Sequence, residues 1–213
     1  TDPRDGDTRW TESLTGTPEF RLLAPDHRRY WQLIAAELQR YGANTLASLV
    51  RLGQGVTYRE ILVDVCDKLD VNYNQKSTTE TIELALLMKV LEKSLDQMSP
   101  EELAAFSHNM HLDLTNPTPQ LILIAVQAAI RTSSLAALEL ATMLSASVIT
   151  SLGGIATWGT VVVASRALSV LAGPLAIALS SAWMISDITG PAYRVTIPAC
   201  IIVSWLRQQH LSR

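Results

Sequence analysis

Apolar and polar residues between positions 26 and 113 alternate with the period of an amphipathic α-helix, three to four residues per repeat. Three capping-box patterns, at Thr57 to Glu60, Ser77 to Glu80 and Ser99 to Glu102, predict three helix starts. An earlier helix is expected to begin with Asp26 as its N-cap. Its inward residues are predicted to be Tyr30, Trp31, Ile34, Leu38 and Tyr41.

The second half of the chain is apolar on all sides, above all between residues 140 and 186. Residues 140–165 and residues 167–186 carry no charge, and runs of about 18 to 20 such residues are long enough to cross a bilayer. Charge spacing therefore places two membrane-length helices around a turn at Arg166. The breaker pairs Gly153-Gly154 and Gly173-Pro174 instead predict turns at those positions and a helix over 155–172. The sequence leaves both interpretations open.

These patterns predict an all-α fold: a multi-helix bundle with amphipathic N-terminal helices around an apolar C-terminal helical hairpin. Residues 1–25 are expected to be mostly irregular, with one short helix at most, and residues 26–115 to form the amphipathic bundle. Asn116-Pro117-Thr118-Pro119 predicts a linker over 116–119, because proline stops a helix. Residues 120–213 form the apolar region, either separate from 26–115 or integrated with it. One long helix is expected over 121–150 and another over 192–209.

Charge is distributed unevenly along the chain. Residues 1–120 carry 12 Lys and Arg against 18 Asp and Glu, whereas residues 121–213 carry five Arg against Glu139 and Asp187. The net charge of −3 argues against nucleic-acid binding. Cys66 and Cys200 lie in apolar helical segments, which favours reduced packing residues.

The start of the chain predicts where the protein resides. It shows no signal-peptide pattern, and it does not begin with Met, which indicates processing or truncation. We expect a cytoplasmic protein that is peripheral to or inserted in the inner membrane.

Ionisable residues within the apolar half are the first candidate site. Arg166, Asp187 and Arg194 stand in segments that otherwise avoid charge. In a membrane such groups are functional candidates; in a soluble bundle, Arg166 and Asp187 would form a buried ion pair that fixes helix register.

His27, Arg28 and Arg29 form a second candidate, for contact with an anion or a lipid headgroup at a helix start. The alternative, which we favour, is a solvated first turn. His108, His111 and Asp113 have the spacing of metal ligands, but no further His or Cys pair accompanies them. No catalytic motif is present, so the sequence predicts no enzymatic activity, no cofactor and no metal.

Four stretches resemble the bacterial YaaW-like family, whose members are sometimes labelled as relatives of ubiquinol–cytochrome c chaperones. They are HRRYWQLIAAE from His27, YREIL from Tyr58, DVCD from Asp64 and GPAYRVTIPA from Gly190. The resemblance spans the whole chain and implies a bacterial, all-helical protein with an additional N-terminal segment in its relatives. The chaperone label implies assembly of a respiratory complex at a membrane. The family brings no activity that could be assigned to residues here.

The leading hypothesis is a non-enzymatic helical protein whose apolar hairpin associates with or inserts into membranes, with pore formation or membrane perturbation as the activity. The alternative is a chaperone-like assembly or interaction factor for a membrane or respiratory protein. A third hypothesis is an enzyme with an unrecognised helical site. The expected partners are membrane lipid or a membrane-protein client, with no nucleic acid, and an oligomer is compatible with the pattern.

Overall fold

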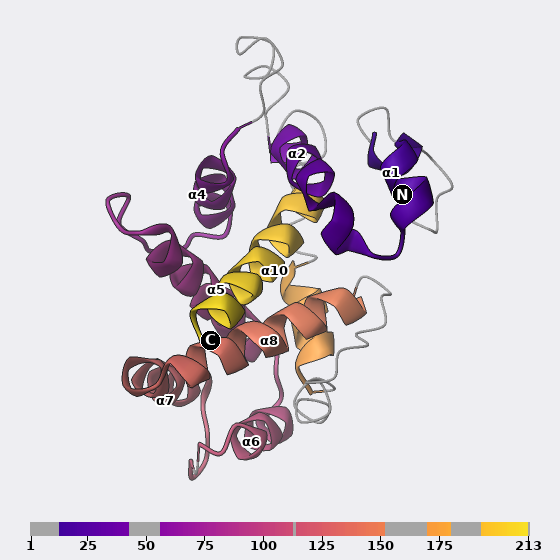
Figure 1. Ribbon diagram of the computed structural model, residues 1–213. Helices are drawn as coiled ribbons and strands as arrows, with labels where there is room; N and C mark the ends of the chain where they lie inside the picture. The colour runs from indigo at the N-terminus through magenta and orange to yellow at the C-terminus, as the bar shows by residue number, and fades with distance from the viewer. Residues whose placement is uncertain (1–12, 43–55, 113, 152–169, 180–192, 213) are drawn as a thin grey trace.

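A computed structural model describes residues 13–42, 56–112, 114–151, 170–179 and 193–212. All regular structure within these ranges is helical, which confirms the all-α fold (Figure 1). The α-helices are α1 (Pro18–Leu23), α2 (Trp31–Gly42), α4 (Tyr58–Lys68), α5 (Thr79–Leu95), α6 (Pro100–Asn109), α7 (Pro119–Thr132), α8 (Ser134–Ser151) and α10 (Tyr193–Leu211). Two 3-10 helices, η1 (Leu14–Gly16) and η2 (His27–Tyr30), flank α1, and Val170–Leu179 forms a further helical segment.

Side-chain caps fix where the front helices begin. Thr57 and Ser99 each form a complete capping box, with Glu60 and Glu102 respectively, as predicted. The cap of α5 differs from the prediction by one residue. Thr78, not Ser77, accepts a hydrogen bond from the Thr81 amide at 3.3 Å, so Glu80 lies one position too early to complete a box.

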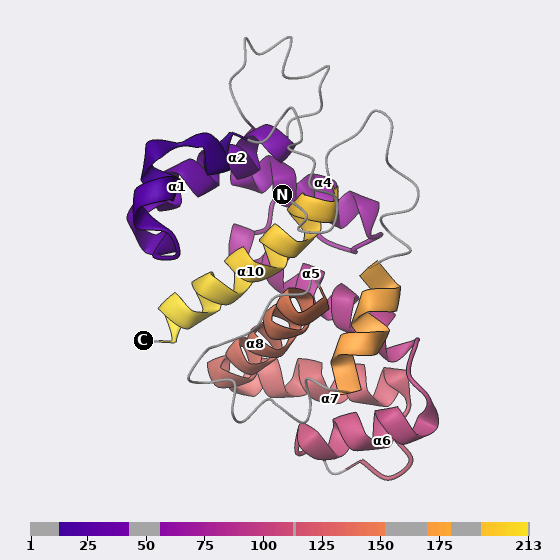
Figure 2. The ribbon, with the colours of Figure 1, turned by 90° about the vertical axis from the view of Figure 1, so that its right-hand side faces the viewer.

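Helix α10 lies at the centre of the fold and packs against α8, α5, α4 and α2 (Figures 1 and 2). Buried apolar residues from Val56 to Trp205 form a single cluster, to which the helices on both sides of the proline-containing segment contribute. Residues 116–119 therefore join two parts of one core, and Pro119 is already the first residue of α7.

The prediction for the inward face of α2 holds in part. Tyr30 is buried and Leu38 packs against the core as expected, but Trp31 is 60% exposed, and the buried side chain on this helix is Glu37, at 6%. The N-terminal segment explains the burial of Glu37, because the Ser13 amide and hydroxyl donate to the Glu37 carboxylate at 2.8 and 2.9 Å. Arg40 pairs with the same carboxylate at 2.9 Å.

The expected helix over 121–150 is two helices, α7 and α8. Ser133 between them is extended, and its hydroxyl accepts a hydrogen bond from the Leu135 amide at 3.2 Å. A serine that bonds to a nearby backbone amide competes with helix continuation. The side chain of Ser133 thus caps the start of α8.

The predicted turn at Gly173-Pro174 is wrong, because the helical segment Val170–Leu179 runs through both residues. Leu171, Leu175 and Leu179, spaced four apart, are all buried there, and their packing outweighs the local preference for a turn. Gly153-Gly154 and most of the predicted hairpin over 140–186 lie outside the described residues, so the hairpin stays a prediction.

The cap of α5 gives a first test. We expect Thr78→Ala to lower the free energy of unfolding by about 1 kcal/mol, since an amide at the helix start loses its partner. The matched variant Ser77→Ala removes a hydroxyl outside the cap and should change stability by less than about 0.5 kcal/mol. Urea unfolding followed by circular dichroism measures both. Equal losses in the two variants would contradict the cap assignment.

Candidate functional site

The candidate site is helix α8 together with the contacts that hold α10 over it. Within the described ranges α8 is the one helix long and apolar enough to cross a membrane, and half of it is buried inside the protein. Glu139 is its sole charged residue. Figure 2 shows α8 between α10 and α7, and α5 also packs against it. Its apolar surface is thus covered by three amphipathic or apolar helices.

Two polar contacts fix α10 against α8. The Trp205 indole N–H donates to the Thr142 hydroxyl at 3.0 Å, and the Ser145 hydroxyl donates to the Ile201 carbonyl at 3.2 Å. The hydroxyl of Ser147 is buried and has no hydrogen-bond partner in the described part of the chain. An unpaired buried hydroxyl costs about 1 to 3 kcal/mol. The packing of α8 therefore includes one unfavourable polar burial.

A buried carboxylate fastens the same C-terminal half of α10 against a third helix. Glu83 of α5 is 0% exposed. Its two oxygens accept hydrogen bonds from the Tyr58 hydroxyl of α4 at 2.8 Å and from Nε of Arg207 at 2.7 Å. A second arm of the Arg207 guanidinium reaches Glu80 at 3.5 Å. The network thus ties α4, α5 and α10 together.

Burial and charge act in opposite directions on the two charged members of this network. Burial raises the pKa of the Glu83 carboxyl above its usual range, although the hydrogen bonds from Tyr58 and Arg207 act in the opposite direction. Burial disfavours the charged form of Arg207 as well, yet its pKa is raised, because the hydrogen bond and charge of Glu83 together with the charges of Glu80 and Tyr58 outweigh that effect. The balance between burial and charge differs for the two residues because their exposure differs. The Arg207 side chain remains 31% exposed, whereas that of Glu83 is 0% exposed.

The two cysteines lie in the same part of the core. Cys66 of α4 and Cys200 of α10 are free thiols, and both are fully buried. Burial raises the pKa of the Cys66 thiol to about 12 and that of Cys200 well above its usual range. Because the thiolate is the reactive form, both cysteines should be inert while α10 is in place.

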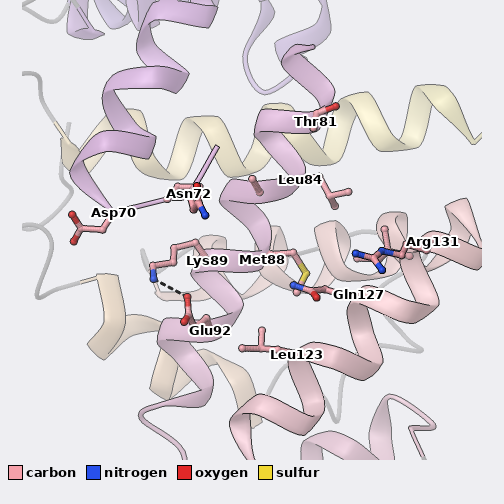
Figure 3. A pocket seen from close by; sticks show the side chains of 13 residues that line it. Asp70, Asn72, Thr81, Leu84, Met88, Lys89, Glu92, Leu123, Gln127 and Arg131 are labelled. Carbon is pink, nitrogen blue, oxygen red and sulfur yellow. Dashed lines mark ion pairs between the residues drawn. The ribbon is translucent and has the colours of Figure 1, made fainter. Parts of the chain in front are cut away.

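A groove of about 570 Å³ lies between α5 and α7. Figure 3 shows its apolar floor, with Leu84, Met88 and Leu123, and the Lys89–Glu92 ion pair at one end. Arg131 of α7 lies at the other end. The groove combines an apolar floor with a charged rim, as binding sites for amphipathic ligands do.

The sequence-predicted residues occupy different places. Arg166 and Asp187 lie outside the described residues, so their pairing stays a prediction, and Arg194 is exposed in the first turn of α10. Arg28 is exposed and pairs with Asp26 at 3.5 Å. His27, Arg28 and Arg29 form the short helix η2 rather than the first turn of an α-helix.

His27 makes one contact of its own. Its ring nitrogen Nδ1 contacts the hydroxyl of the buried Tyr30. His108 lies in the last turn of α6 and His111 two residues beyond its end, while Asp113 lies outside the described residues. No group of three possible metal ligands occurs among the described residues.

Sequence reasoning missed the network of Tyr58, Glu83 and Arg207. The available signal was the position of Glu83 relative to the apolar residues of its helix. Glu83 stands four residues before Leu87 and seven before Val90, so it lies on the apolar face of α5. A glutamate on that face requires a buried partner, but the partner is 124 positions away on α10.

Comparison with known proteins identifies the family. A UPF0174 protein of Helicobacter pylori strain J99 is 42% identical over 207 residues, which cover 96% of this chain and 81% of that protein. The UPF0174 protein YaaW of Escherichia coli K12 is 31% identical over 197 residues, which cover 92% of this chain and 76% of YaaW. The chain belongs to the UPF0174 family. A second UPF0174 protein of strain J99 is 35% identical over 204 residues.

The predicted YaaW-like resemblance is thereby confirmed. The UPF0174 chain matches no family model, and no solved structure matches it.

Removing Arg207 tests the network. We expect Arg207→Met to destabilise this UPF0174 chain by about 3 kcal/mol or more, because it leaves the buried Glu83 carboxylate without its cation. The double variant Glu83→Gln/Arg207→Met should recover most of the loss, since Gln still accepts from Tyr58. Urea unfolding of the four members of the cycle gives the coupling energy. Additive effects would contradict a coupled pair.

The raised pKa of Glu83 predicts a pH dependence. The folded protein holds the Glu83 proton more tightly than the unfolded chain does, so this group contributes most to stability at low pH, and the contribution is lost as pH rises through the folded pKa. Relative to Glu83→Gln, the unsubstituted chain should therefore gain stability when pH is lowered from neutral. Unfolding of both proteins over a pH series measures the difference. A loss of stability of the unsubstituted chain relative to Glu83→Gln at acidic pH would contradict the predicted direction.

Proposed function

We propose that this chain is a non-enzymatic, membrane-associated protein whose apolar helix α8 exchanges its protein cover for lipid. The observation that carries the proposal is α8 itself. Its 18 residues give a length of about 27 Å at about 1.5 Å per residue, close to the hydrocarbon thickness of about 30 Å. The inserted unit would be the predicted hairpin over 140–186, and perturbation of the bilayer, including pore formation, would be the activity.

Three hydroxyl side chains of α8 are compatible with lipid. The hydroxyls of Thr142, Thr150 and Ser151 donate to carbonyls of α8 itself, at 2.7, 2.9 and 2.8 Å. A hydroxyl that is satisfied within its own helix does not need water or a partner helix. Leaving the protein therefore costs α8 the contacts of Thr142 and Ser145 with α10, and few other polar contacts.

The proposed exchange of protein cover for lipid is a shift between two conformations of the chain. In the folded protein α10, α7 and α5 cover α8, and in the membrane-bound form lipid would cover the same apolar surface. Lipid favours the open form only to the extent that it binds that form better. We infer that the protein works at the cytoplasmic face of the inner membrane.

Sedimentation with vesicles tests the proposal. We expect the native chain to pellet with vesicles of 70:30 phosphatidylcholine and phosphatidylglycerol and to resist carbonate extraction. Glu139→Gln should raise the resistant fraction by at least about threefold, because it removes the charge of α8 from the bilayer. Glu19→Gln on α1 is the matched control, since it changes the net charge equally outside α8.

Thiol reactivity reports separately whether α10 opens. Cys66 and Cys200 are the two cysteines of the chain, so a maleimide should label neither in solution and both in the vesicle-bound form. A chain that stays in the supernatant with unreactive thiols in every condition would show that α8 is a core helix, and the proposal would fail.

The second candidate is a chaperone-like assembly factor for a membrane or respiratory protein. The groove between α5 and α7 favours it, because an apolar floor with a charged rim suits an amphipathic client helix. This candidate requires no opening of α10. Client binding with unreactive Cys66 and Cys200 would therefore support it over the membrane proposal.

A further inference from the structure

We propose that the outer face of α7, formed by Leu121, Ile124, Ala128 and Arg131, docks on the surface of an anionic bilayer while α8 is still folded into the protein. The proposal rests on the membrane function above and names the surface and the lipid class of first contact. All four residues are exposed, with Leu121 at 44% and Ile124 at 62%.

The four residues share one side of α7. They follow each other at intervals of three, four and three residues, which places them on one helical stripe. The opposite side of the helix carries Ile122 and Val126, which are buried against the protein. Helix α7 is thus apolar on both sides, and packing against α5 and α8 uses one of them.

The charge pattern of α7 selects an anionic partner. Arg131 is its one charged residue, and the helix has no Asp or Glu. The chain as a whole carries −3, so an anionic bilayer repels it except where the local charge is positive. Exposed apolar side chains bury in the headgroup region of a bilayer, and a neighbouring arginine is attracted to anionic headgroups.

The position of α7 in the chain links docking to insertion. Ser133 alone separates it from α8. With the outer face of α7 in the headgroup region, α8 starts within one residue of the bilayer. Leu135, in the first turn of α8, is 65% exposed and extends the apolar surface across the junction.

A second exposed apolar surface exists at the N-terminal end, where Leu22, Trp31 and Ile34 are exposed. Residues 18–34 carry Arg21, Arg28 and Arg29 against Glu19 and Asp26, a net charge of +1 that equals that of α7. Arg28 pairs with Asp26 at 3.5 Å. This surface also lies on α1 and α2, far from α8 in the sequence. Chain connectivity to α8 therefore favours α7.

Paired substitutions decide between the two surfaces. The variant Leu121→Gln/Ile124→Gln should lower the partition coefficient onto 70:30 phosphatidylcholine–phosphatidylglycerol vesicles at least about tenfold, because it removes exposed apolar area that lipid would bury. Leu22→Gln/Ile34→Gln exchanges the same residue types on the other surface, at 81% and 36% exposure, and should leave partition within about twofold. Circular dichroism and urea unfolding verify that both variants fold.

The contribution of the Arg131 charge to vesicle binding is tested with a separate variant. Arg131→Gln should weaken binding to the anionic vesicles roughly fivefold and leave binding to pure phosphatidylcholine unchanged. Equal weakening on both vesicle types would overturn the headgroup assignment.

Other outcomes overturn the proposal in distinguishable ways. If the native chain binds vesicles and the α7 variant binds equally well, docking on α7 is wrong while the membrane function stands. Loss of binding in the Leu22/Ile34 variant alone places the docking surface at the N-terminal end. A native dimer that the α7 variant dissociates identifies a second copy of the chain as the occupant. If the native chain binds no vesicle, the membrane function fails, and this proposal fails with it.

Discussion

The fold depends on one constraint: α8 is apolar on nearly every side, and half of it is buried under other helices. Burial of apolar surface is the main force that stabilises a fold, but it has no direction. Any sufficiently apolar surroundings satisfy it, whether they are protein or lipid. Helix α10 supplies most of the cover in the folded protein, and its packing against α5, α4 and α2 connects that cover to the capped front helices.

Because apolar contact does not specify one arrangement, polar contacts specify it here. The Trp205–Thr142 hydrogen bond sets the register of α10 along α8, and the Arg207–Glu83 bond sets it along α5. A buried ion pair adds little net stability, since desolvation offsets the attraction of the charges. The raised pKa of Glu83 has the same cause, because the desolvation of its carboxylate outweighs the hydrogen bonds and the positive charge that favour the ionised form. We therefore regard the network as a device that selects one position of α10 and not as a source of stability.

Local features of this fold could be predicted from the sequence, and features that depend on distant partners could not. The capping boxes at Thr57 and Ser99 act within four residues and were predicted correctly. Glu37 and Glu83 are buried because of partners 24 and 124 positions away, so the apolar period alone predicted neither buried carboxylate. In the apolar half, packing overrode the local signal at Gly173-Pro174.

The electrostatics of Glu83 also limit how α8 can be released. If α10 leaves α5, water reaches the Glu83 carboxylate and its pKa falls back towards that of an exposed glutamate. Protonation of Glu83 at low pH therefore favours the form in which α10 is packed against α5. Proteins that open when a carboxylate is neutralised behave in the opposite way. Under the membrane proposal, the free energy for opening would come from lipid that binds the open form better than the closed one. Docking through α7 would bring that lipid next to α8 before α10 moves, so that contact with the membrane is itself the trigger.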